Sequence, residues 1–296
     1  MDSRVKIVLT GATGFLGSFL LKNLVKENYD VVVLKRSFSN IYRIKNLLPK
    51  IRYYDLDKVS IEQVFLENEV DTVIHCAVNY GRGKESVFKV VETNLFFSLK
   101  LLETALLYNV TTFFNTDTLL PCGVSTYALS KSQFVEWLKI FANSKQIQVI
   151  NLKLEHMYGL NDGDTKFVNW IISELLQNKK EVCLTKGEQK RDFIYIDDVV
   201  AAYMLLLKRK NEFSDYAEFD VCTGSKITIK KFVQKIYSKI KKQRDIDTYL
   251  NFGAIPYRKG EIMEINEDTS KLFSLGWKPM VSLDAGVNKI IRHCLG

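Results

Sequence analysis

The sequence is poor in the residues that usually build metal centres and disulfide frameworks. Only three of its 296 residues are histidines, which argues against a histidine-rich metal site. Five cysteines form no CxxC pair, which argues against a zinc site and favours reduced thiols. They are Cys76, Cys122, Cys183, Cys222 and Cys294. We therefore expect no metal in the function of this protein.

Long apolar segments are missing as well. No run approaches the length of a membrane span. Met1 leads almost directly into the first expected strand, with no room for a signal peptide. The sequence also has no low-complexity linker and no internal repeat. These absences lead us to expect a cytoplasmic protein without a membrane partner.

What the sequence does have is apolar content and positive charge. Hydrophobic residues make up 47% of the chain, and the formal net charge is +8. The densest basic run, residues 226–244, carries apolar residues at helical spacing and predicts an amphipathic helix with a lysine-rich solvent face. No recognised nucleic-acid module accompanies it, so we expect no nucleic-acid partner. The length fits one large domain or two unequal ones.

A glycine pattern near the N-terminus is the central signal. An apolar run at residues 7–9 precedes Gly11, Gly14 and Gly17, and a helical pattern follows. This order predicts a strand, a tight turn and a helix whose first amides bind a pyrophosphate. Three glycines alone would also fit an ordinary strand-to-helix turn, but their position favours a dinucleotide.

Strands and helices alternate through the first half of the chain. The expected strands are 30–36, 52–56, 71–77, 111–116 and 148–154, and the expected helices are 60–66, 87–108 and 127–144. These strands are too apolar for a sheet that is exposed on one side. The pattern therefore predicts an α/β fold, a doubly wound parallel Rossmann sheet with helices on both faces.

The pattern changes at Glu155, where segments shorten and loops become frequent. We expect a strand at 192–196 that returns to the main body, a helix at 199–207 and one more sheet strand at 218–221. The predicted division has a Rossmann domain at 1–155, with returning segments at about 191–223. Residues 156–190 and 224–296 then form a smaller, interleaved substrate-binding region.

The pair Tyr127 and Lys131 is the candidate for acid–base chemistry. The two residues are four positions apart and share one face of the predicted helix. A neighbouring ammonium favours the phenolate, so we expect Lys131 to lower the pKa of Tyr127. Tyr127 could then donate a proton to a carbonyl oxygen, which Thr116 at the end of the preceding strand could also hold. A surface pair and a plain strand-end threonine are the alternatives.

The end of the second strand bears on the choice of cofactor. NAD-binding relatives carry an acid there, which holds the ribose 2′-hydroxyl. This chain has Lys35, Arg36 and Ser37 instead. Two cations and a hydroxyl fit a 2′-phosphate, so NADP(H) is favoured over NAD(H), although exposed basic residues would look the same.

Several motifs together resemble the extended short-chain dehydrogenase/reductase family, the NAD-dependent epimerase/dehydratase family. They are residues 10–17, residues 75–77, Asn94, Thr116 and the Tyr127–Lys131 pair. Residues 187–199 and 275–279 are similar to the sugar-nucleotide branch of that family. More narrowly, residues 154–159, 162–167 and 252–263 resemble the enzymes that make CDP-abequose and CDP-paratose.

The resemblance implies a reduction, by NADPH, of the C4 ketone of a CDP-4-keto-3,6-dideoxyhexose for O-antigen sugars of lipopolysaccharide. It implies that Tyr127 is the acid, that Lys131 binds the nicotinamide ribose and that Thr116 polarises the ketone. The implied cofactor contacts are Gly11, Thr13, Gly14, Phe15, Leu16, Gly17, Asp55, Leu56, Ala77 and Asn94. The implied substrate contacts are Thr118, His156, Lys166, Phe167, Arg191 and Arg258. Planar guanidinium groups suit a diphosphate.

Other readings stay open. A nucleotide-sugar 4-epimerase, which recycles NAD, is the nearest rival, and a CDP-4-keto-6-deoxyheptose is an alternative substrate. A 4,6-dehydratase would usually carry Thr-Asp-Glu where this chain has Thr116-Asp117-Thr118. A redox-sensing or RNA-associated binding protein would often have lost the Tyr127–Lys131 pair. His156 fits a structural histidine equally well. The family commonly forms homodimers.

Overall fold

The computed structural model describes residues 5–82 and 85–295, so Met1 and the expectation attached to it lie outside the described part. The chain divides into two compact units. The first comprises residues 1–154 and 200–221, and the second comprises residues 155–199 and 222–296. Within the described residues, no helix is both long and apolar enough to cross a membrane.

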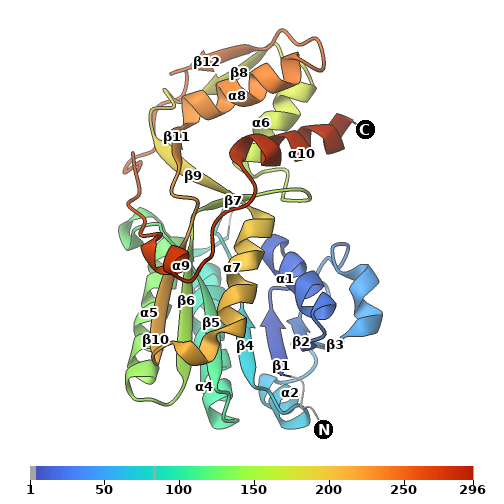
Figure 1. Cartoon of the computed structure of the whole chain (residues 1–296), viewed down its shortest axis with the longest axis vertical. Coiled ribbons are helices and arrows are strands. Elements are labelled where there is room, and N and C mark those ends of the chain that lie inside the picture. Colours follow the sequence, from blue (N-terminus) through green and yellow to red (C-terminus); the bar gives the residue numbers. More distant parts are fainter. Residues whose placement is uncertain (1–4, 83–84, 296) are drawn as a thin grey trace. The chain divides into compact units, whose positions relative to one another are not determined.

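The first unit is built on one seven-stranded sheet with the order β10-β6-β5-β4-β1-β2-β3, and every pairing in it is parallel (Figure 1). Its strands are β1 (Lys6–Thr10), β2 (Asp30–Lys35), β3 (Arg52–Asp55), β4 (Thr72–His75), β5 (Thr112–Thr118), β6 (Gln148–Leu154) and β10 (Tyr216–Val221). This confirms the predicted parallel sheet. The strand order reverses between β1 and β4, which is where ligands bind in sheets of this kind.

Helices cover both faces of this sheet. One face shares an apolar core with α2 (Ile61–Glu67), α4 (Phe97–Leu107) and α5 (Thr126–Asn143). The other face carries α1 (Phe15–Lys26) and the part of α7 (Ile196–Lys208) that belongs to this unit. Lys208 of α7 donates to Glu27, just past the end of α1, at 2.9 Å. The unit is therefore doubly wound, as the sequence predicts.

The predicted long helix at 87–108 is confirmed but is not uniform. It consists of α3 (Val87–Val91), a π-helical segment η2 (Glu92–Phe96) and α4. Single π turns inside helices are frequent at functional sites, and this one carries Asn94. The remaining short 3₁₀ segments of the first unit are η1 (Lys45–Lys50), η3 (Cys122–Val124) and η4 (Lys210–Glu212).

The second unit has two small sheets, with the orders β11-β9-β7 and β12-β8. Its elements are β7 (His156–Tyr158), α6 (Phe167–Leu176), β8 (Glu181–Leu184), β9 (Lys190–Tyr195), β11 (Lys226–Thr228), α8 (Ile229–Lys241), β12 (Tyr249–Phe252), α9 (Ser270–Ser274) and α10 (Leu283–Leu295). Helix α8 is the predicted amphipathic helix. Its Phe232 is fully buried and stacks on Phe193 of β9 at 4.0 Å between ring centroids.

One placement from the sequence was wrong. The strand expected at 192–196 is β9, and it pairs with β7 and β11 instead of the central sheet. Residues 191–199 therefore belong to the second unit, and the returning segment begins at Val200. An apolar strand pattern does not tell which sheet a strand joins, because both sheets offer a buried position. The strand expected at 218–221 is confirmed as β10, parallel to β6.

The motif at 187–199 has a structural role in the second unit. The buried carboxylate of Asp198 accepts hydrogen bonds from the backbone N–H groups of Met280 and Val281 at 2.9 and 3.0 Å. Trp277 donates its indole N–H to the Asp198 carbonyl at 3.3 Å. The two sequence motifs that resemble the sugar-nucleotide branch therefore bind one another and fix the segment that leads into α10.

Candidate active site

The glycine turn after β1 brings backbone close to backbone. Gly11 has a φ of +70°, and a Cβ there would lie 2.5 Å from the carbonyl carbon of Cys76, which follows β4. A Cβ on Gly17 would collide with the carbonyl oxygen of Gly11. Helix α1 starts after Gly14 without a side-chain cap in the described residues, so its first amides can meet an anion.

Thr10 joins the ends of β1 and β4. Its hydroxyl oxygen accepts the backbone N–H groups of Cys76 and Ala77, both at 3.2 Å, and lies 2.8 Å from Nδ1 of His75. Nε2 of His75 lies 2.8 Å from the Ser98 hydroxyl. Burial holds the pKa of His75 well below its usual value, with the Lys131 charge as the smaller cause. His75 is therefore a neutral structural residue that fixes this edge of the sheet.

The cations expected to hold a 2′-phosphate have partners of their own. Lys35, whose side chain is only 8% exposed, forms an ion pair with Asp55. The Ser37 hydroxyl donates to Asp57 at 2.6 Å, and its N–H donates to the same carboxylate at 2.7 Å. These two hydrogen bonds are the main cause of the lowered pKa of Asp57. Arg36 is exposed and lies over the Phe38 ring.

A further cation lies near the glycine turn, and the sequence analysis did not single it out. Nη1 of Arg43 is 3.5 Å from the carbonyl oxygen of Thr13. Arg43 comes from the segment between β2 and β3, thirty residues after Thr13 along the chain. No motif marks such a loop residue, and only the fold brings it to the turn.

Tyr127 stands in the first turn of α5, after the Ser125 cap, whose hydroxyl accepts the N–H of Ala128 at 3.1 Å. Its ring packs against Tyr80 at 5.1 Å. Burial is the largest cause that raises the pKa of Tyr127, and Tyr80 and Asp117 add to it, while the Thr118 side chain at the end of β5 is among the groups that lower this pKa. The expected lowering of this pKa by Lys131 is therefore wrong.

The side-chain amine of Lys131 has a different hydrogen-bond partner. Its buried Nζ donates to Oδ1 of Asn115 at 3.4 Å, and Asn115 donates to Asn151 at 2.8 Å. Burial lowers the pKa of Lys131, while the Asp117 carboxylate raises it. A spacing of four residues correctly places Tyr127 and Lys131 on the same helix, but it does not fix the direction of a long lysine side chain.

Two threonines end β5 beside this tyrosine. The Thr116 hydroxyl lies 2.7 Å from the Tyr203 phenol and 3.2 Å from the Cys76 thiol. Thr118, expected to contact substrate, lies close enough to the Tyr127 phenol to favour its ionised form. Both threonines and Tyr127 therefore gather at the carboxyl edge of the sheet, in the first unit.

Asn94 connects three parts of this edge. It accepts the N–H of Asn79, donates to the Asn79 carbonyl, both at 2.8 Å, and donates to the Ser130 hydroxyl at 3.0 Å. Only 1% of its surface is exposed. Asn94 thus holds the loop after β4 against α5, next to Lys131.

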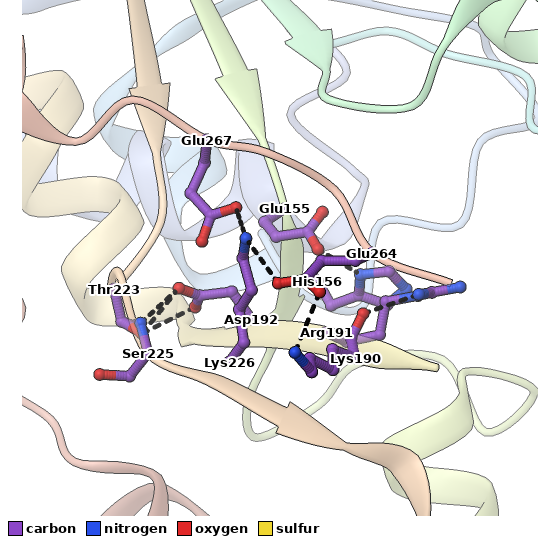
Figure 2. Close-up of polar contacts among 10 residues, drawn as sticks. All are labelled: Glu155, His156, Lys190, Arg191, Asp192, Thr223, Ser225, Lys226, Glu264 and Glu267. Atoms are coloured by element: carbon purple, nitrogen blue, oxygen red, sulfur yellow. Dashed lines mark hydrogen bonds and ion pairs between the residues drawn. The ribbon is translucent and has the colours of Figure 1, made fainter. Parts of the chain in front are cut away.

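The remaining predicted substrate residues lie in the second unit. Figure 2 draws two of them, His156 and Arg191. Arg191 donates to the Glu261 carboxylate at 2.6 Å and to the Lys190 carbonyl at 2.7 Å. The Arg258 carbonyl accepts the N–H of Glu261 at 3.0 Å, so Glu261 links the two predicted arginines. Arg258 itself is exposed.

The other three predicted substrate residues, His156, Lys166 and Phe167, do not form a single cluster of contacts in the described structure. Nδ1 of His156 lies 3.4 Å from the Glu155 carboxylate, and the His156 ring meets the edge of Phe193. Phe167 packs against Phe232 at 6.2 Å and so takes part in the core of the second unit. Lys166 immediately precedes α6.

The fold and this constellation define a dinucleotide-binding α/β protein with a tyrosine and a lysine at the carboxyl edge of its sheet. Residues 7–222 match the family model described as "NAD dependent epimerase/dehydratase family". The chain belongs to that family, whose description names a nicotinamide cofactor.

Similar proteins extend the comparison over the whole chain. CDP-abequose synthase of Salmonella typhimurium is 33% identical, with 97% of each chain covered. A UDP-glucose 4-epimerase structure from Thermotoga maritima, with UDP-glucose, has a TM-score of 0.83 at 24% identity and covers 99% of this chain and 100% of its own. A UDP-glucuronic acid 4-epimerase from Bacillus cereus, with UDP-glucuronic acid and NAD, has a TM-score of 0.83 at 22% identity and covers 98% of each chain. These structures share the fold.

Proposed function

We propose that the protein reduces the C4 ketone of a CDP-linked 4-keto-3,6-dideoxyhexose with NADPH. The observation that carries this proposal is the position of Tyr127 in the first turn of α5, beside Tyr80 and close to Asp117 and Thr118 at the end of β5. The relative named CDP-abequose synthase supports the choice of a CDP-sugar. The sequence resemblance would assign the reaction to the synthesis of O-antigen deoxysugars in the cytoplasm.

When bound, NADPH supplies a hydride to C4. Tyr127 gives its phenolic proton to the oxygen that becomes the alcohol, so one hydride and one proton convert ketone to alcohol. A phenol with a raised pKa remains protonated at neutral pH, and the phenolate that it leaves is still a weaker base than the alkoxide that it protonates, which suits this role. Lys131 binds the nicotinamide ribose and steadies the phenolate that is left.

NADPH is proposed over NADH because Arg36 and Arg43 both belong to the segment that follows β2. Arg43 lies beside the glycine turn, and a guanidinium suits a 2′-phosphate. Replacing Arg43 with Ala should weaken NADPH binding about tenfold and leave NADH binding within about twofold. Equal losses for both cofactors would contradict this assignment.

A 4-epimerase that retains NAD is the second candidate. It is favoured by the Lys35–Asp55 ion pair and by the Asp57 carboxylate at Ser37, which reduce the positive charge at the end of β2. An anionic side chain here suits a free ribose 2′-hydroxyl.

One assay separates these functions. The purified protein is incubated with a CDP-4-keto-3,6-dideoxyhexose and NADPH, and loss of the reduced-nicotinamide absorbance is followed. Stoichiometric consumption supports the reductase, whereas an epimerase consumes none. NMR of the product then distinguishes abequose from paratose, and a CDP-4-keto-6-deoxyheptose tests the alternative sugar.

A homodimer is part of the proposal. Apolar side chains are exposed on α4 and α5, namely Leu107, Leu129, Trp137 and Ile140. Two such helices from each copy could bury these residues against one another. Light scattering of the purified protein tests this, and a monomer at micromolar concentration would contradict it.

A further inference from the structure

A buried tyrosine from the returning segment reaches the strand end that carries Thr116. Tyr203 lies on α7 and is 1% exposed. Its phenolic oxygen is 2.7 Å from Oγ1 of Thr116, a normal distance for a hydroxyl–hydroxyl hydrogen bond. The contact joins residues 87 positions apart, both within the first unit.

The second neighbour of Thr116 is a thiol. Sγ of Cys76, directly after β4, lies 3.2 Å from the same threonine oxygen. Burial raises the pKa of Cys76 to about 12 and the pKa of Tyr203 well above its usual value. Both groups therefore keep their protons at neutral pH, and both can donate to Thr116.

A hydroxyl has one proton to donate and two lone pairs that accept. If the threonine oxygen accepts from Tyr203, its own proton stays available for another acceptor. If Thr116 instead donates to Tyr203, it has no proton left for a ketone. Thr116 can therefore polarise a substrate carbonyl only if it accepts from Tyr203 and from Cys76 and donates to neither.

We infer that Tyr203 is a positioning residue, whose phenol donates to Thr116 and thereby turns the Thr116 proton toward the C4 ketone oxygen. This inference rests on the proposed ketone reduction. Tyr203 touches neither substrate nor cofactor in this role and acts through Thr116. A hydrogen-bond donor aimed at developing negative charge accelerates acyl transfer about 100-fold or more, and an oriented donor to a ketone oxygen acts in the same way.

A purely structural reading is the competing explanation. A buried phenol needs a hydrogen-bond partner, and Thr116 could serve only for that purpose. This reading predicts that Tyr203→Phe changes stability but not turnover. The positioning role predicts a loss of kcat that depends on the presence of the threonine hydroxyl, so the two readings separate in a double-mutant cycle.

The test compares Tyr203→Phe, Thr116→Val and the double variant of the full chain by steady-state reduction of the CDP-4-keto sugar. We expect Thr116→Val to lower kcat about 100-fold and Tyr203→Phe about tenfold, with NADPH binding within about twofold. The double variant should be no slower than Thr116→Val alone. Thr116→Ser, which keeps the hydroxyl, should retain most of the turnover.

Tyr216→Phe is the matched control. Tyr216 is also a phenol of the first unit and donates to Glu218 at 2.8 Å, away from Thr116. It should keep kcat within about twofold, even though the hydrogen bond that it loses, to a carboxylate, is stronger than one to a neutral hydroxyl. Should Tyr203→Phe fail to fold, Tyr203→Met fills a similar volume without a donor and replaces it in the cycle.

Four results would overturn the inference. Unchanged kcat in Tyr203→Phe would do so, as would independent, multiplicative losses in the double variant. Full turnover in Thr116→Val would show that the threonine proton is not used, while leaving ketone reduction itself intact. A wild-type protein that binds NADPH and leaves the ketone unreduced would overturn the proposed function, and the role of Tyr203 with it.

Discussion

The two units hold their functional side chains by different means. In the first unit, Thr116, Tyr127 and the glycine turn stand where regular strands and helices end, so the sheet itself fixes their positions. In the second unit, Arg191 is held by Glu261, which comes from a loop seventy residues later. The first arrangement is set by backbone geometry, and the second by side chains that pair with one another.

This difference separates chemistry from recognition. If the proposed function is right, changes in the first unit should affect turnover or the cofactor, while changes in the second should affect the substrate alone. Kinetic constants distinguish these effects, since loss of an interaction made only in the transition state lowers kcat, and loss of uniform binding raises KM.

Replacing Tyr127 with Phe should have the largest effect. Phe keeps the ring that packs on Tyr80 but removes the proton that the ketone needs. We expect kcat to fall by about 10³-fold, with NADPH affinity within about twofold, because general acids typically contribute about 10²- to 10⁴-fold. Stopped-flow turnover and fluorescence titration measure the two quantities.

Tyr80→Phe is the control, because it keeps the ring contact and leaves the Tyr127 phenol in place. It should retain most of the turnover. Undiminished reduction by Tyr127→Phe would mean that another group donates the proton and that the first unit does not carry the chemistry as described.

Gly17→Ala should act on the cofactor through the backbone. Its added Cβ would collide with the Gly11 carbonyl, so the helix must move away from the turn. We expect a loss of about 1–3 kcal/mol of unfolding free energy, typical of overpacking, and a large loss of NADPH affinity. Thermal unfolding with and without cofactor measures both.

Gly123→Ala is matched to it, since nothing lies within 4 Å of a Cβ at that position. It should unfold within a degree or two of the wild type, as expected of a substitution without clashes. Normal NADPH binding by Gly17→Ala would contradict the close approach of α1 to the turn as the basis of the pyrophosphate site.

Replacing Arg191 with Lys tests the second unit. Lysine retains one charge but not the fork that grips two oxygens at once. We expect KM for the CDP-sugar to rise about tenfold, with kcat and NADPH affinity nearly unchanged. Lys190→Ala, which removes only an exposed ion pair with Glu264, should leave KM within about twofold. A fall in kcat without a change in KM would break the proposed division between the units.

The sequence was sufficient to predict the individual strands and helices of the first unit. The glycine turn and the parallel strands are local consequences of glycine spacing and apolar period. Side-chain directions were not predictable in this way. Lys131 and Tyr127 share a helix as expected, yet Lys131 bonds to Asn115 and burial raises the pKa of Tyr127.

Contacts between segments that are distant in the sequence could not be predicted either, because they depend on the complete fold. Tyr203 and Arg43 belong to no motif, and Glu261 belongs to one that does not indicate its partner; each meets its partner only after the chain has folded. β9 shows the corresponding error at the level of a strand. Its apolar pattern predicted a strand correctly but did not specify its sheet, because pairing partners depend on the topology of the whole unit.

The smallest expected effect concerns pH and again belongs to the first unit. Lys131 faces Asp117 on β5, Cys76 directly after β4, and His75 at the end of β4. Burial lowers the pKa of Lys131, and Asp117 opposes this. The Asp117 carboxylate is itself held at 3.2 Å by Asn151, which reaches Lys131 through Asn115.

Asp117→Asn should therefore lower the pKa of Lys131 further, because the carboxylate that favours the ammonium form is gone. Lys131 must be protonated to steady the Tyr127 phenolate, so the alkaline limb of kcat should move to lower pH, with turnover near neutral pH less affected. Glu218→Gln is the control. It belongs to the same network and bonds to Asn151 at 2.9 Å, but it is not among the groups that shift Lys131. If the alkaline limb moves equally in both variants, the shift comes from a general loosening of the network. If the limb does not move in Asp117→Asn, Lys131 keeps its proton without this carboxylate.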